Sequence, residues 1–383
     1  MKKISFNKAY NYKWDNFSFK QFVTETSGNG IYTKNAQSFF KDEFGFKSLL
    51  TSSCTDALEM SAILSNIKFG DEVILPSYTF VSTANAFLLR GAKLIFIDTE
   101  DNFPNIDASK IEEHITKKTK AIICVHYGGF SCNMSKLLEL KRKYNLILIE
   151  DAAQAFDNFY IDNIGNKIPL GSIGDYGTFS FHETKNISCG EGGLLIVNND
   201  QFKRAEIIWE KGTNRSSFYR GEVDKYEWVD IGSSFLMSDI TAYLLYQNLK
   251  RYKKIQKKRL ELWHLYEELL QPLINEGYLE NIDYPKYSTK NGHNFFIVLK
   301  SKEELEKLKL YLYNKKISAV THYRPLHNSK FFKQYYKGEE LINTIKFSER
   351  LLRIPLHFYL TDNDVMFTVS TIHNFFKKSN QFK

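Results

Sequence analysis

Lys185 is the residue whose type and setting most suggest covalent chemistry. It ends a β-like run that begins at Thr178, and a glycine-rich turn, Gly190–Gly193, and a second apolar run, Leu194–Val197, follow it. This order predicts a lysine on a short loop between two strands. A solvated loop lysine is the default interpretation, so a chemical role for the amine depends on the side chains that the fold places around it.

Asp151 is the first candidate neighbour. It ends the apolar run Leu146–Glu150, and the small residues Ala152 and Ala153 after it leave room for a flat ring. The run predicts a buried strand, so the carboxylate would lie at the edge of the sheet where ligands bind. The alternative is structural, because an aspartate at the end of a strand often caps the next helix.

Hydroxyl groups and an aromatic ring complete the set. Ser53, Cys54 and Thr55 precede an amphipathic segment, and they predict free N–H groups and hydroxyls at a helix N-terminus, which bind anions. Helix capping alone also explains this cluster. Ser77–Phe80 follows the first predicted strand and offers an aromatic face.

Together these groups match the requirements of pyridoxal phosphate. The lysine amine would form a Schiff base, the carboxylate would keep the pyridine nitrogen protonated, and the helix N-terminus would bind the phosphate. No metal or nucleotide-phosphate motif competes. His182-Glu183 lacks the second histidine of an HExxH helix, His322 and His327 have no neighbouring carboxylate or thiol cluster, and Gly190–Gly193 has neither GxGxxG nor P-loop spacing.

The elements expected to position these residues alternate between strands and helices. Between residues 50 and 200 the pattern predicts a βαβ series with a largely parallel sheet buried on both faces. The expected strands are Val73–Leu75, Leu94–Ile97, Ala121–Val125 and Leu146–Ile149, and the expected helices include Thr55–Ile67 and Met134–Tyr144. Polar residues follow three of these strands, namely Asp98, His126 and the pair Glu150-Asp151.

The C-terminal part has a different pattern. A helical pattern from about Met237 to Leu270 predicts one long helix that joins a large domain, residues 1–250, to a small α+β domain, residues 251–383. In the small domain we expect strands over Lys290–Leu299 and Ile317–Tyr323 and helices over Ser301–Lys315 and Asp362–Lys377. The predicted fold class is therefore α/β, with a mostly parallel central sheet and a smaller C-terminal α+β domain.

Composition excludes several classes of protein. The chain has 383 residues, is 43% hydrophobic and carries 52 Lys and Arg against 44 Asp and Glu, which excludes a disordered or collagen-like chain. The densest basic stretch, Lys250–Arg259, reads as the solvated face of a helix, and no nucleic-acid-binding motif accompanies it. The net charge of +8 suits an anionic small substrate.

Cysteine usage and hydropathy suggest a compartment. The four cysteines, at positions 54, 124, 132 and 189, form no CxxC pair, so reduced thiols are expected. No apolar N-terminal run and no stretch of about 18 apolar residues is present. We therefore expect a cytoplasmic protein with no membrane partner.

Several segments resemble one protein family. Pro76–Asn85, Val125–Gly129, Glu150–Gln154 and Ser180–Asn186 are similar to motifs of the DegT/StrS family of sugar-nucleotide aminotransferases, and the resemblance covers nearly the whole chain. Further segments most resemble the dTDP-4-amino-4,6-dideoxygalactose transaminases within it, namely Lys211–Ser216, Gly221–Tyr226, Asp230–Ser234 and His322–His327. The resemblance implies fold type I of the pyridoxal-phosphate-dependent transferases and a homodimer with active sites at the subunit interface.

The resemblance also implies roles for individual residues. Lys185 would bind the cofactor covalently and act as acid and base, with Asp151 facing the pyridine nitrogen. The other implied cofactor contacts are Gln154 to the ring hydroxyl, Phe80 stacked on the ring, and Ser53, Cys54, Thr55 and Ser180 around the phosphate. Many family members donate an Asn from the partner subunit to the phosphate, whereas this chain has Leu236 there, and Ser233 or Ser234 are the candidate substitutes.

Substrate contacts follow from the same resemblance. Arg215 and Arg220 would hold a nucleotide diphosphate on a loop that extends to Tyr226, and exposed loop arginines are the alternative. His182, Tyr323 and His327 would contact the hexose, and packed side chains are the alternative.

The implied reaction converts dTDP-4-keto-6-deoxyglucose to dTDP-4-amino-4,6-dideoxygalactose for a surface glycan such as lipopolysaccharide. Glutamate is the expected donor, and pyridoxamine phosphate is the intermediate form of the cofactor. Amination at C3, a gluco product, a dehydratase and a non-catalytic regulator on the same fold are the alternatives. Lys185 argues against the dehydratase, which in related families has a histidine in its place.

Overall fold

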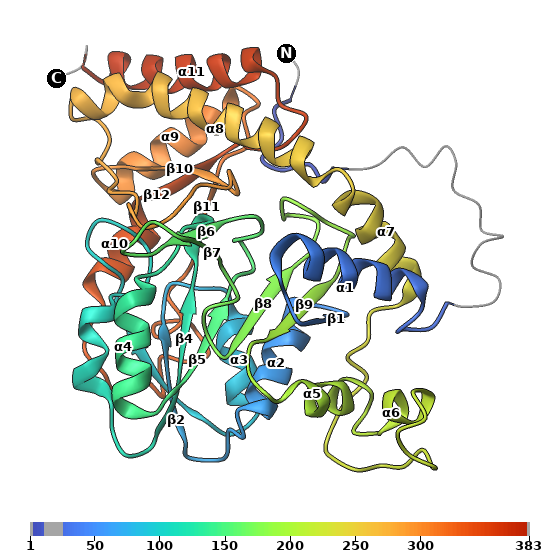
Figure 1. Ribbon diagram of the computed structural model, residues 1–383. Helices are drawn as coiled ribbons and strands as arrows, with labels where there is room; N and C mark the ends of the chain where they lie inside the picture. Colours follow the sequence, from blue (N-terminus) through green and yellow to red (C-terminus); the bar gives the residue numbers. More distant parts are fainter. Residues whose placement is uncertain (1–2, 11–25, 381–383) are drawn as a thin grey trace.

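The computed structural model describes residues 3–10 and 26–380, in a large part and a smaller part that each contain a sheet (Figure 1). The large sheet has seven strands in the order β1-β9-β8-β5-β4-β2-β3. They are β1 (Ser48–Thr51), β2 (Glu72–Pro76), β3 (Lys93–Ile97), β4 (Thr119–Val125), β5 (Ile147–Asp151), β8 (Tyr176–Ser180) and β9 (Gly193–Val197). The neighbouring strands pair in parallel except where β9 pairs with β1 and β8, so the predicted mostly parallel sheet is confirmed.

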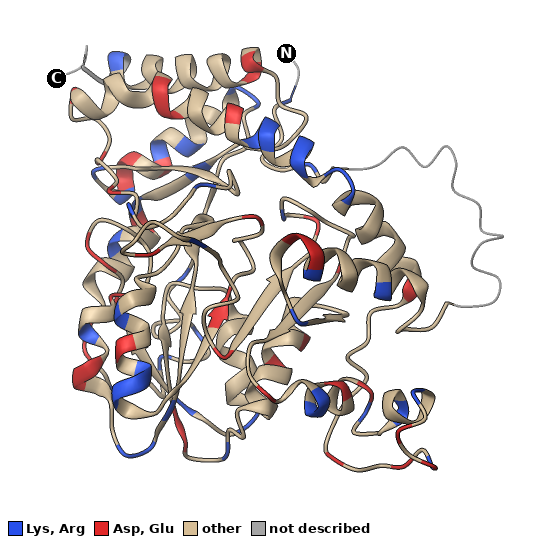
Figure 2. Ribbon diagram, viewed as in Figure 1, with Lys and Arg blue, Asp and Glu red and all other residues tan. Residues whose placement is uncertain are grey.

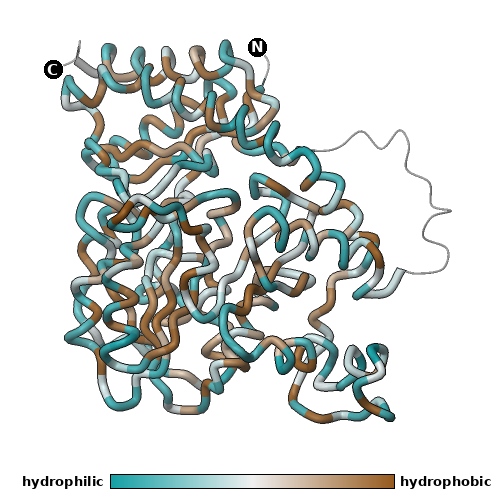
Figure 3. The backbone as a smooth tube through the Cα atoms, viewed as in Figure 1, coloured by the Kyte–Doolittle hydropathy of each residue, from teal (hydrophilic) through white to brown (hydrophobic). Residues whose placement is uncertain are grey.

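Helices cover both faces of this sheet. On one face lie α2 (Cys54–Leu64), α3 (Val81–Leu88) and α5 (Phe202–Trp209), and on the other lie α1 (Ile31–Phe44), α4 (Met134–Tyr144) and α7 (Asp239–Leu249). Because side chains alternate along a strand, Ile122 packs into the core under α4 while Ile123 packs into the core under α2. Hydrophobic residues accordingly run along the central strands (Figure 3).

The smaller part is an antiparallel sheet packed against helices. Its strands are β10 (Phe295–Val298), β11 (Val320–Thr321) and β12 (Leu351–Ile354), in the order β10-β12-β11, and its helices are α8 (Tyr252–Asn275), α9 (Lys302–Asn314), α10 (Ile342–Arg350) and α11 (Asp362–Asn380). Shorter elements are β6 (Phe159–Ile161), β7 (Lys167–Pro169), α6 (Arg215–Tyr219) and 3-10 turns at Ala108–Lys110, Glu112–His114 and Tyr127–Gly129. The α/β class with a smaller α+β part is therefore confirmed. None of the described helices is long and apolar enough to cross a membrane.

The single long helix predicted over Met237–Leu270 is wrong, because two helices, α7 and α8, occupy this region. At the break the Arg251 N–H donates to the carbonyl of Asn248 at 3.0 Å. The carbonyl of Gln247, which a continuous helix would offer to that N–H, instead accepts from the Arg251 guanidinium at 2.7 Å. The apolar spacing continues across the break because both helices pack on the same core, so periodicity alone did not reveal it.

The sequence predicted that the basic stretch Lys250–Arg259 forms a solvated helix face, and the structure confirms this for only part of the stretch. Arg259 is buried, and Lys253 and Lys258 pair with Glu43 and Asp362 at 3.4 and 3.1 Å. Figure 2 shows acidic residues interspersed with the basic ones over the surface helices.

Residues 3–10 tie the beginning of the chain to its C-terminal part. The Ile4 N–H donates to the carbonyl of Lys316 at 2.9 Å, and the Leu356 N–H donates to the carbonyl of Phe6 at 3.3 Å. Asn7 Nδ2 donates to the carbonyl of Glu183 at 3.1 Å, in the loop that carries Lys185. We propose that residues 1–250 form the large domain and residues 251–383 the small domain. Residues 3–10 belong to the first range but pack on the small part.

Candidate active site

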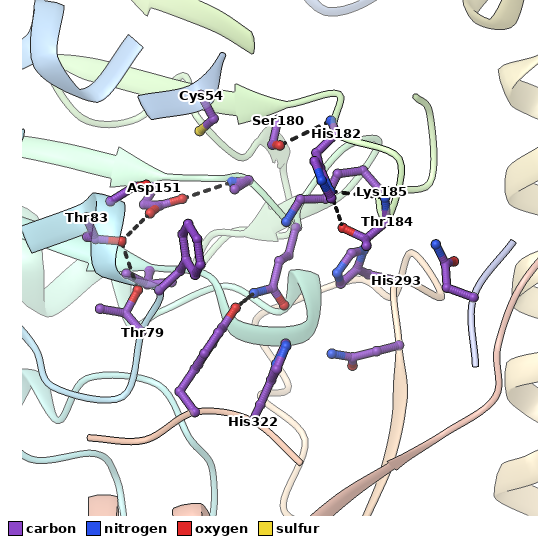
Figure 4. A pocket seen from close by; sticks show the side chains of 18 of the residues that line it. Cys54, Thr79, Thr83, Asp151, Ser180, His182, Thr184, Lys185, His293 and His322 are labelled. Carbon is purple, nitrogen blue, oxygen red and sulfur yellow. Dashed lines mark hydrogen bonds between the residues drawn. The ribbon is translucent and has the colours of Figure 1, made fainter. Parts of the chain in front are cut away.

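A cavity of about 570 Å³ lies where the carboxyl ends of β5 and β8 face the small part (Figure 4). It collects many of the side chains that the sequence singled out, from elements far apart in the chain. The predicted site residues that line it are Ser53, Cys54, Thr55, Phe80, Asp151, Gln154, Ser180, His182, Lys185 and Tyr323. The strand order brings these residues together.

The Asp151 carboxylate is held in a fixed orientation at the end of β5. Its Oδ2 accepts a hydrogen bond from Thr83 Oγ1 at 2.7 Å, and Thr83 in turn contacts Thr79 Oγ1 at 2.9 Å. Its Oδ1 accepts the Ala153 N–H at 3.1 Å. The bond to Ala153 resembles the local capping that the sequence left open, but the bond to Thr83 on α3 orients the carboxylate on the cavity wall, where it fits a role toward a bound ring.

The N-terminus of α2 forms an anion cradle. Ser53 caps the helix, with its hydroxyl accepting the Asp56 N–H at 3.1 Å, and no described residue accepts from the N–H groups of Cys54 and Thr55. A Cβ at Gly193 would lie 2.3 Å from the Ser53 carbonyl oxygen, so a glycine is required for β9 to approach this helix end. These free N–H groups fit the phosphate of pyridoxal phosphate.

Hydroxyl groups surround the cradle. Thr55 Oγ1 lies 2.8 Å from Ser82 Oγ, and Ser180 Oγ at the end of β8 accepts the His182 N–H at 3.3 Å. Each hydroxyl has further hydrogen-bonding capacity for a phosphate oxygen. The cavity thus brings together an oriented carboxylate and the free N–H groups and hydroxyls of a helix N-terminus, and the sequence assigned both to a cofactor.

Lys185 lies on the loop between β8 and β9 and points into the cavity (Figure 4). No described residue forms a hydrogen bond with its amine. Burial lowers the pKa of this amine, and the positive charge of Arg353 lowers it further, while Cys54 and Asp151 act in the opposite direction. A lowered pKa increases the neutral, nucleophilic fraction of the amine, which a covalent bond to a carbonyl requires.

Gln154 and Tyr323 connect the large and small parts across the cavity. Gln154 Oε1 accepts the Gly128 N–H at 2.8 Å, and its Nε2 donates to the Tyr323 hydroxyl at 3.1 Å. Tyr323 is stacked on His322 with ring centroids 3.9 Å apart. Gln154 is thus anchored at both ends.

Phe80 and His182 lie at the mouth of the cavity. The Phe80 side chain is 57% exposed, so its ring has an open face. His182 Nδ1 lies 2.9 Å from Thr184 Oγ1, and its Nε2 lies 3.6 Å from Glu191. Both residues are placed to contact a ligand that enters the cavity.

Other predicted residues do not line this cavity. Arg215, Arg220, Tyr226 and Ser233 lie in or near residues 215–231, which we call the arm. Arg220 pairs with Glu206 at 3.0 Å and with Glu222 at 2.8 Å. Arg215 lies over the Tyr219 ring, while Tyr226 and Ser233 are exposed. Within one chain, the arm is therefore not part of the site.

His327 also lies outside the cavity and is packed. It is buried, and its Nδ1 lies 2.7 Å from Ser77 Oγ. Burial lowers its pKa. The packed alternative left open by the sequence therefore describes His327 in this structure.

Sequence reasoning missed several residues of the cavity wall. They are Phe6, Asn7, Thr79, Thr83, His293, His322 and Arg353. Thr83 lies among other small and polar residues of α3 and gives no separate sequence signal, whereas Arg353 interrupts the apolar run Leu351–Ile354, which is a sequence signal of a polar group facing a cavity.

The histidine after β4 belongs to a buried network beside the cavity. His126 Nε2 lies 3.0 Å from Glu150, and its Nδ1 accepts the Cys132 N–H at 3.1 Å. Glu150 also accepts N–H groups from Gly171, Ile173 and Gly174 at 2.6–2.8 Å. Although ligand atoms of Cys124, His126 and Cys132 lie within 4.8 Å of one another, both ring nitrogens are already engaged, so the trio is a packing cluster.

Comparison with known proteins agrees with this geometry. Residues 28–373 match the model of the DegT/DnrJ/EryC1/StrS aminotransferase family. An uncharacterized protein of Methanocaldococcus jannaschii is 33% identical, covering 90% of this chain and 89% of that protein. The spore coat polysaccharide biosynthesis protein SpsC of Bacillus subtilis is 30% identical, covering 93% and 94% of the two chains.

A solved structure shares the fold. The PLP form of the sugar aminotransferase Spr1654 from Streptococcus pneumoniae, so described, superposes with a TM-score of 0.87 at 22% identity. The match covers 98% of this chain and 99% of that chain.

Proposed function

The chain belongs to the DegT/DnrJ/EryC1/StrS aminotransferase family and is a pyridoxal-phosphate-dependent sugar aminotransferase of fold type I, and from this premise we propose that it aminates a nucleotide-linked keto-deoxysugar. The single observation that carries the proposal is the cavity in which Lys185, Asp151 and the α2 N-terminus converge. In detail, we propose that it converts dTDP-4-keto-6-deoxyglucose to dTDP-4-amino-4,6-dideoxygalactose with glutamate as the donor.

Different residues of the cavity would bind different parts of pyridoxal phosphate. Cys54, Thr55 and Ser180 would bind the phosphate, Gln154 the ring hydroxyl, and Phe80 one face of the ring. When bound, pyridoxal phosphate supplies an electron-withdrawing ring that stabilises negative charge at the carbon next to the reacting nitrogen. Asp151 would keep the ring nitrogen protonated, and Lys185 Nζ would take up and return the proton at that carbon.

A second hollow supports an elongated anionic substrate. It has a volume of about 1240 Å³ and shares the lining residues His322 and Tyr323 with the active-site cavity, so the two lie side by side. Four basic side chains line it, namely Lys302, Lys309, Arg324 and Lys330. Lys302 and Lys309 pair with Glu349 and Glu306 of the same lining at 2.8 and 3.6 Å, which leaves the charges of Arg324 and Lys330 unpaired among the described residues of this hollow. A sugar held near Lys185 would direct its nucleotide diphosphate toward this basic hollow or toward Arg215 and Arg220 of a partner subunit.

We propose a homodimer whose arm completes the neighbouring site. The arm carries exposed apolar side chains, namely Phe218, Tyr219, Tyr226, Trp228, Val229 and Ile231, and Trp228 is 81% exposed. Exposed apolar clusters of this kind are typical of protein interfaces. The arm does not reach its own cavity, so a partner subunit is the natural recipient of Arg215, Arg220 and Ser233. We further propose a cytoplasmic location, in keeping with cysteines that form no disulfide.

Product analysis tests the proposal. The holoenzyme is incubated with glutamate and a panel of dTDP- and UDP-linked keto sugars, and the products are identified by mass spectrometry and NMR. We expect an axial amine at C4 of the dTDP-linked 6-deoxyhexose. An equatorial C4 amine or amination at C3 would refute the product, and no amination of any nucleotide sugar would refute the substrate class.

A further inference from the structure

Asn294 is a buried residue of the cavity wall whose side-chain amide has no partner among the described residues. The residue is 4% exposed and lines the cavity that contains Lys185. Both Nδ2 and Oδ1 are buried, and no described residue forms a hydrogen bond with either atom. A buried amide without partners destabilises the folded chain, so a ligand that supplies the missing hydrogen bonds gains binding energy here.

The polar groups next to this amide do have partners. Asn291 Nδ2 donates to the carbonyl of Gln154 at 2.8 Å, and Asn291 Oδ1 accepts the His293 N–H at 3.0 Å. The backbone carbonyl of Asn294 accepts a hydrogen bond from Trp263 Nε1 at 3.1 Å. These bonds fix the backbone around Asn294, whereas its own amide takes no part in them.

The Asn294 side chain faces the large part. Asn294 directly precedes β10, and Phe296, two positions later and so on the same face, lies 5.7 Å from Tyr127 between ring centroids. A Cβ at Gly128 would lie 3.0 Å from Asn294 Oδ1, so the amide packs against the 3-10 turn after β4. The Gly128 N–H donates to Gln154 Oε1 at 2.8 Å. Asn294 therefore lies against the same turn as Gln154, the residue proposed to bind the ring hydroxyl of the cofactor.

The chemistry of an amide restricts which ligand group can satisfy it. Nδ2 only donates hydrogen bonds and Oδ1 only accepts them. A carboxylate or a phosphate only accepts, so it would leave Oδ1 unpaired, and an ammonium group would leave Nδ2 unpaired. Two neighbouring hydroxyls match both atoms, because one can donate to Oδ1 while the other accepts from Nδ2. In the proposed reaction, the keto sugar is the molecule that carries such a pair.

We propose that the Asn294 amide binds the neighbouring hydroxyls on C2 and C3 of the keto sugar, and this inference rests on the proposed function. C3 is the ring carbon next to C4, and C2 is the next one along. A sugar whose C4 reacts beside Lys185 therefore brings both hydroxyls into the cavity that Asn294 lines. Asn294 is then a residue that determines which sugars are accepted.

Sugar analogues test this role on the wild type. The pyridoxamine-phosphate form is mixed with dTDP-4-keto-6-deoxyglucose, the parent sugar, or with its 2-deoxy or 3-deoxy analogue, and the cofactor absorbance is followed. We expect the rate constant to fall by about 50-fold with each analogue, because the loss of one hydroxyl leaves a buried amide atom unpaired. Reaction with both analogues within about threefold of the parent sugar would overturn the proposal without any variant.

Asn294→Leu removes the amide and keeps the branching of the side chain. This variant should react about tenfold more slowly with the parent sugar, and its loss with each analogue should shrink from about 50-fold to within about threefold. The reaction with glutamate should stay within about threefold of the wild type, because a carboxylate does not match the amide. A full loss with each analogue in Asn294→Leu would overturn the proposal, as would a slower glutamate reaction with unchanged discrimination between sugars.

Binding without turnover separates the hexose from the nucleotide. Calorimetry is done with dTDP and with dTDP-6-deoxyglucose, which has no keto group and so is not aminated, together with its 3-deoxy analogue. We expect Asn294→Leu to bind dTDP as the wild type does and to bind the two sugars equally, whereas the wild type should favour the sugar with the C3 hydroxyl by about 50-fold. Weaker dTDP binding with the preference between sugars intact would overturn the proposal.

Asn248→Leu is the matched control. Asn248 is also buried and its Oδ1 has no partner among the described residues, but it does not line the cavity. This variant should keep the full discrimination between the sugars, and an equal loss of discrimination in both variants would overturn the proposal. If Asn294→Leu does not fold, Asn294→Ala replaces it in the same assays. Failure of the proposed function itself is distinguishable, because the wild type would then aminate no keto sugar, including the parent sugar.

Discussion

The cavity around Lys185 and the arm, residues 215–231, differ in how far a single chain completes them. In the cavity, Asp151, Ser180 and the α2 cradle lie at strand ends and a helix N-terminus, and each forms a hydrogen bond with a residue of its own chain. The arm has exposed aromatic side chains, and Arg220 pairs with acidic residues of its own chain. The fold of one chain fixes a site built from strand ends, whereas the arm can contribute to a site only when it contacts another subunit.

Removing the amine of Lys185 is expected to have the largest effect. Lys185→Ala should lower transamination by at least about a thousandfold, because no other amine in the cavity can bond to the cofactor. The variant should lose the visible absorbance of the loaded enzyme and still bind pyridoxamine phosphate through the cradle and Asp151. Activity assays, absorption spectra and pyridoxamine-phosphate titration measure these outcomes.

Lys167→Ala, in the exposed β6–β7 hairpin, is the control for Lys185→Ala and should change neither the spectrum nor the rate. Full activity of Lys185→Ala would contradict the assignment of the whole cavity.

Asp151→Asn should have the next largest effect. The amide keeps the shape but not the charge, so turnover should fall by about 100-fold, equivalent to about 3 kcal/mol in the barrier. The cofactor should still bind. Steady-state kcat measures the loss.

Asp175 provides a matched control. Its carboxylate accepts the N–H of Leu148, on the strand β5 that ends at Asp151, at 2.9 Å, but Asp175 does not line the cavity. Asp175→Asn should affect stability and not turnover. A rate constant for Asp151→Asn equal to that of the wild type would make Asp151 a helix cap only.

Changes in the arm should act more weakly and in a different parameter. Arg215→Ala with Arg220→Ala should raise KM for the nucleotide sugar by about tenfold through lost phosphate contacts, and leave the reaction with the donor unchanged. Trp228→Ser should weaken self-association, measured by analytical ultracentrifugation.

If the arm variants instead slowed the donor half-reaction of the isolated protomer, the contrast between the arm and the cavity would fail. Lys225→Ala, a nearby exposed change on the same arm, is the control for altered charge alone.

Glu100 is a largely buried carboxyl that does not line the active-site cavity, so its substitution tests the effect of burial on stability alone. Burial raises the pKa of its carboxyl to about 7, with Cys132 and Asp107 adding to the rise. The folded state therefore holds a proton that the unfolded chain releases, so this contribution to stability is present below the unfolded pKa and is lost as pH rises through about 7.

Glu100→Gln should therefore stabilise the protein at pH 8 relative to pH 5 by about 1 kcal/mol, a value reduced for partial exposure. Urea unfolding at the two pH values measures the difference. An equal effect at both values would place a charged Glu100 in the folded state throughout.

Much of the fold and the cofactor site could be predicted from sequence because the signals were local. Helix α4 was predicted with its observed bounds, since Asn133 caps its N-terminus and Asn145 takes the left-handed conformation after its end. Asp151 was predicted at the cavity edge because a buried parallel strand defines where its end lies. Such features depend on spacing that a single segment contains.

The remaining features depend on contacts between distant segments. Strand β12 follows α10 without a turn, and its four residues show no alternation, so nothing in Leu351–Ile354 indicated a central strand. At the break between α7 and α8 the Arg251 guanidinium bonds to the carbonyl of Gln247, and the apolar spacing has no gap there. The arm was assigned by family resemblance, and its position outside the cavity became visible only in the fold.

The segment of residues 3–10 has a consequence for the order in which the chain folds during synthesis. Asn7 bonds to Glu183, 176 residues later, while Ile4 and Phe6 bond to Lys316 and Leu356 near the end of the chain. The large sheet can form before the C-terminal part of the chain has been synthesised, since domains generally fold as they emerge from the ribosome. Residues 3–10 are translated before the segments that they bind, so they complete the cavity wall beside Arg353 only after β12 has been synthesised.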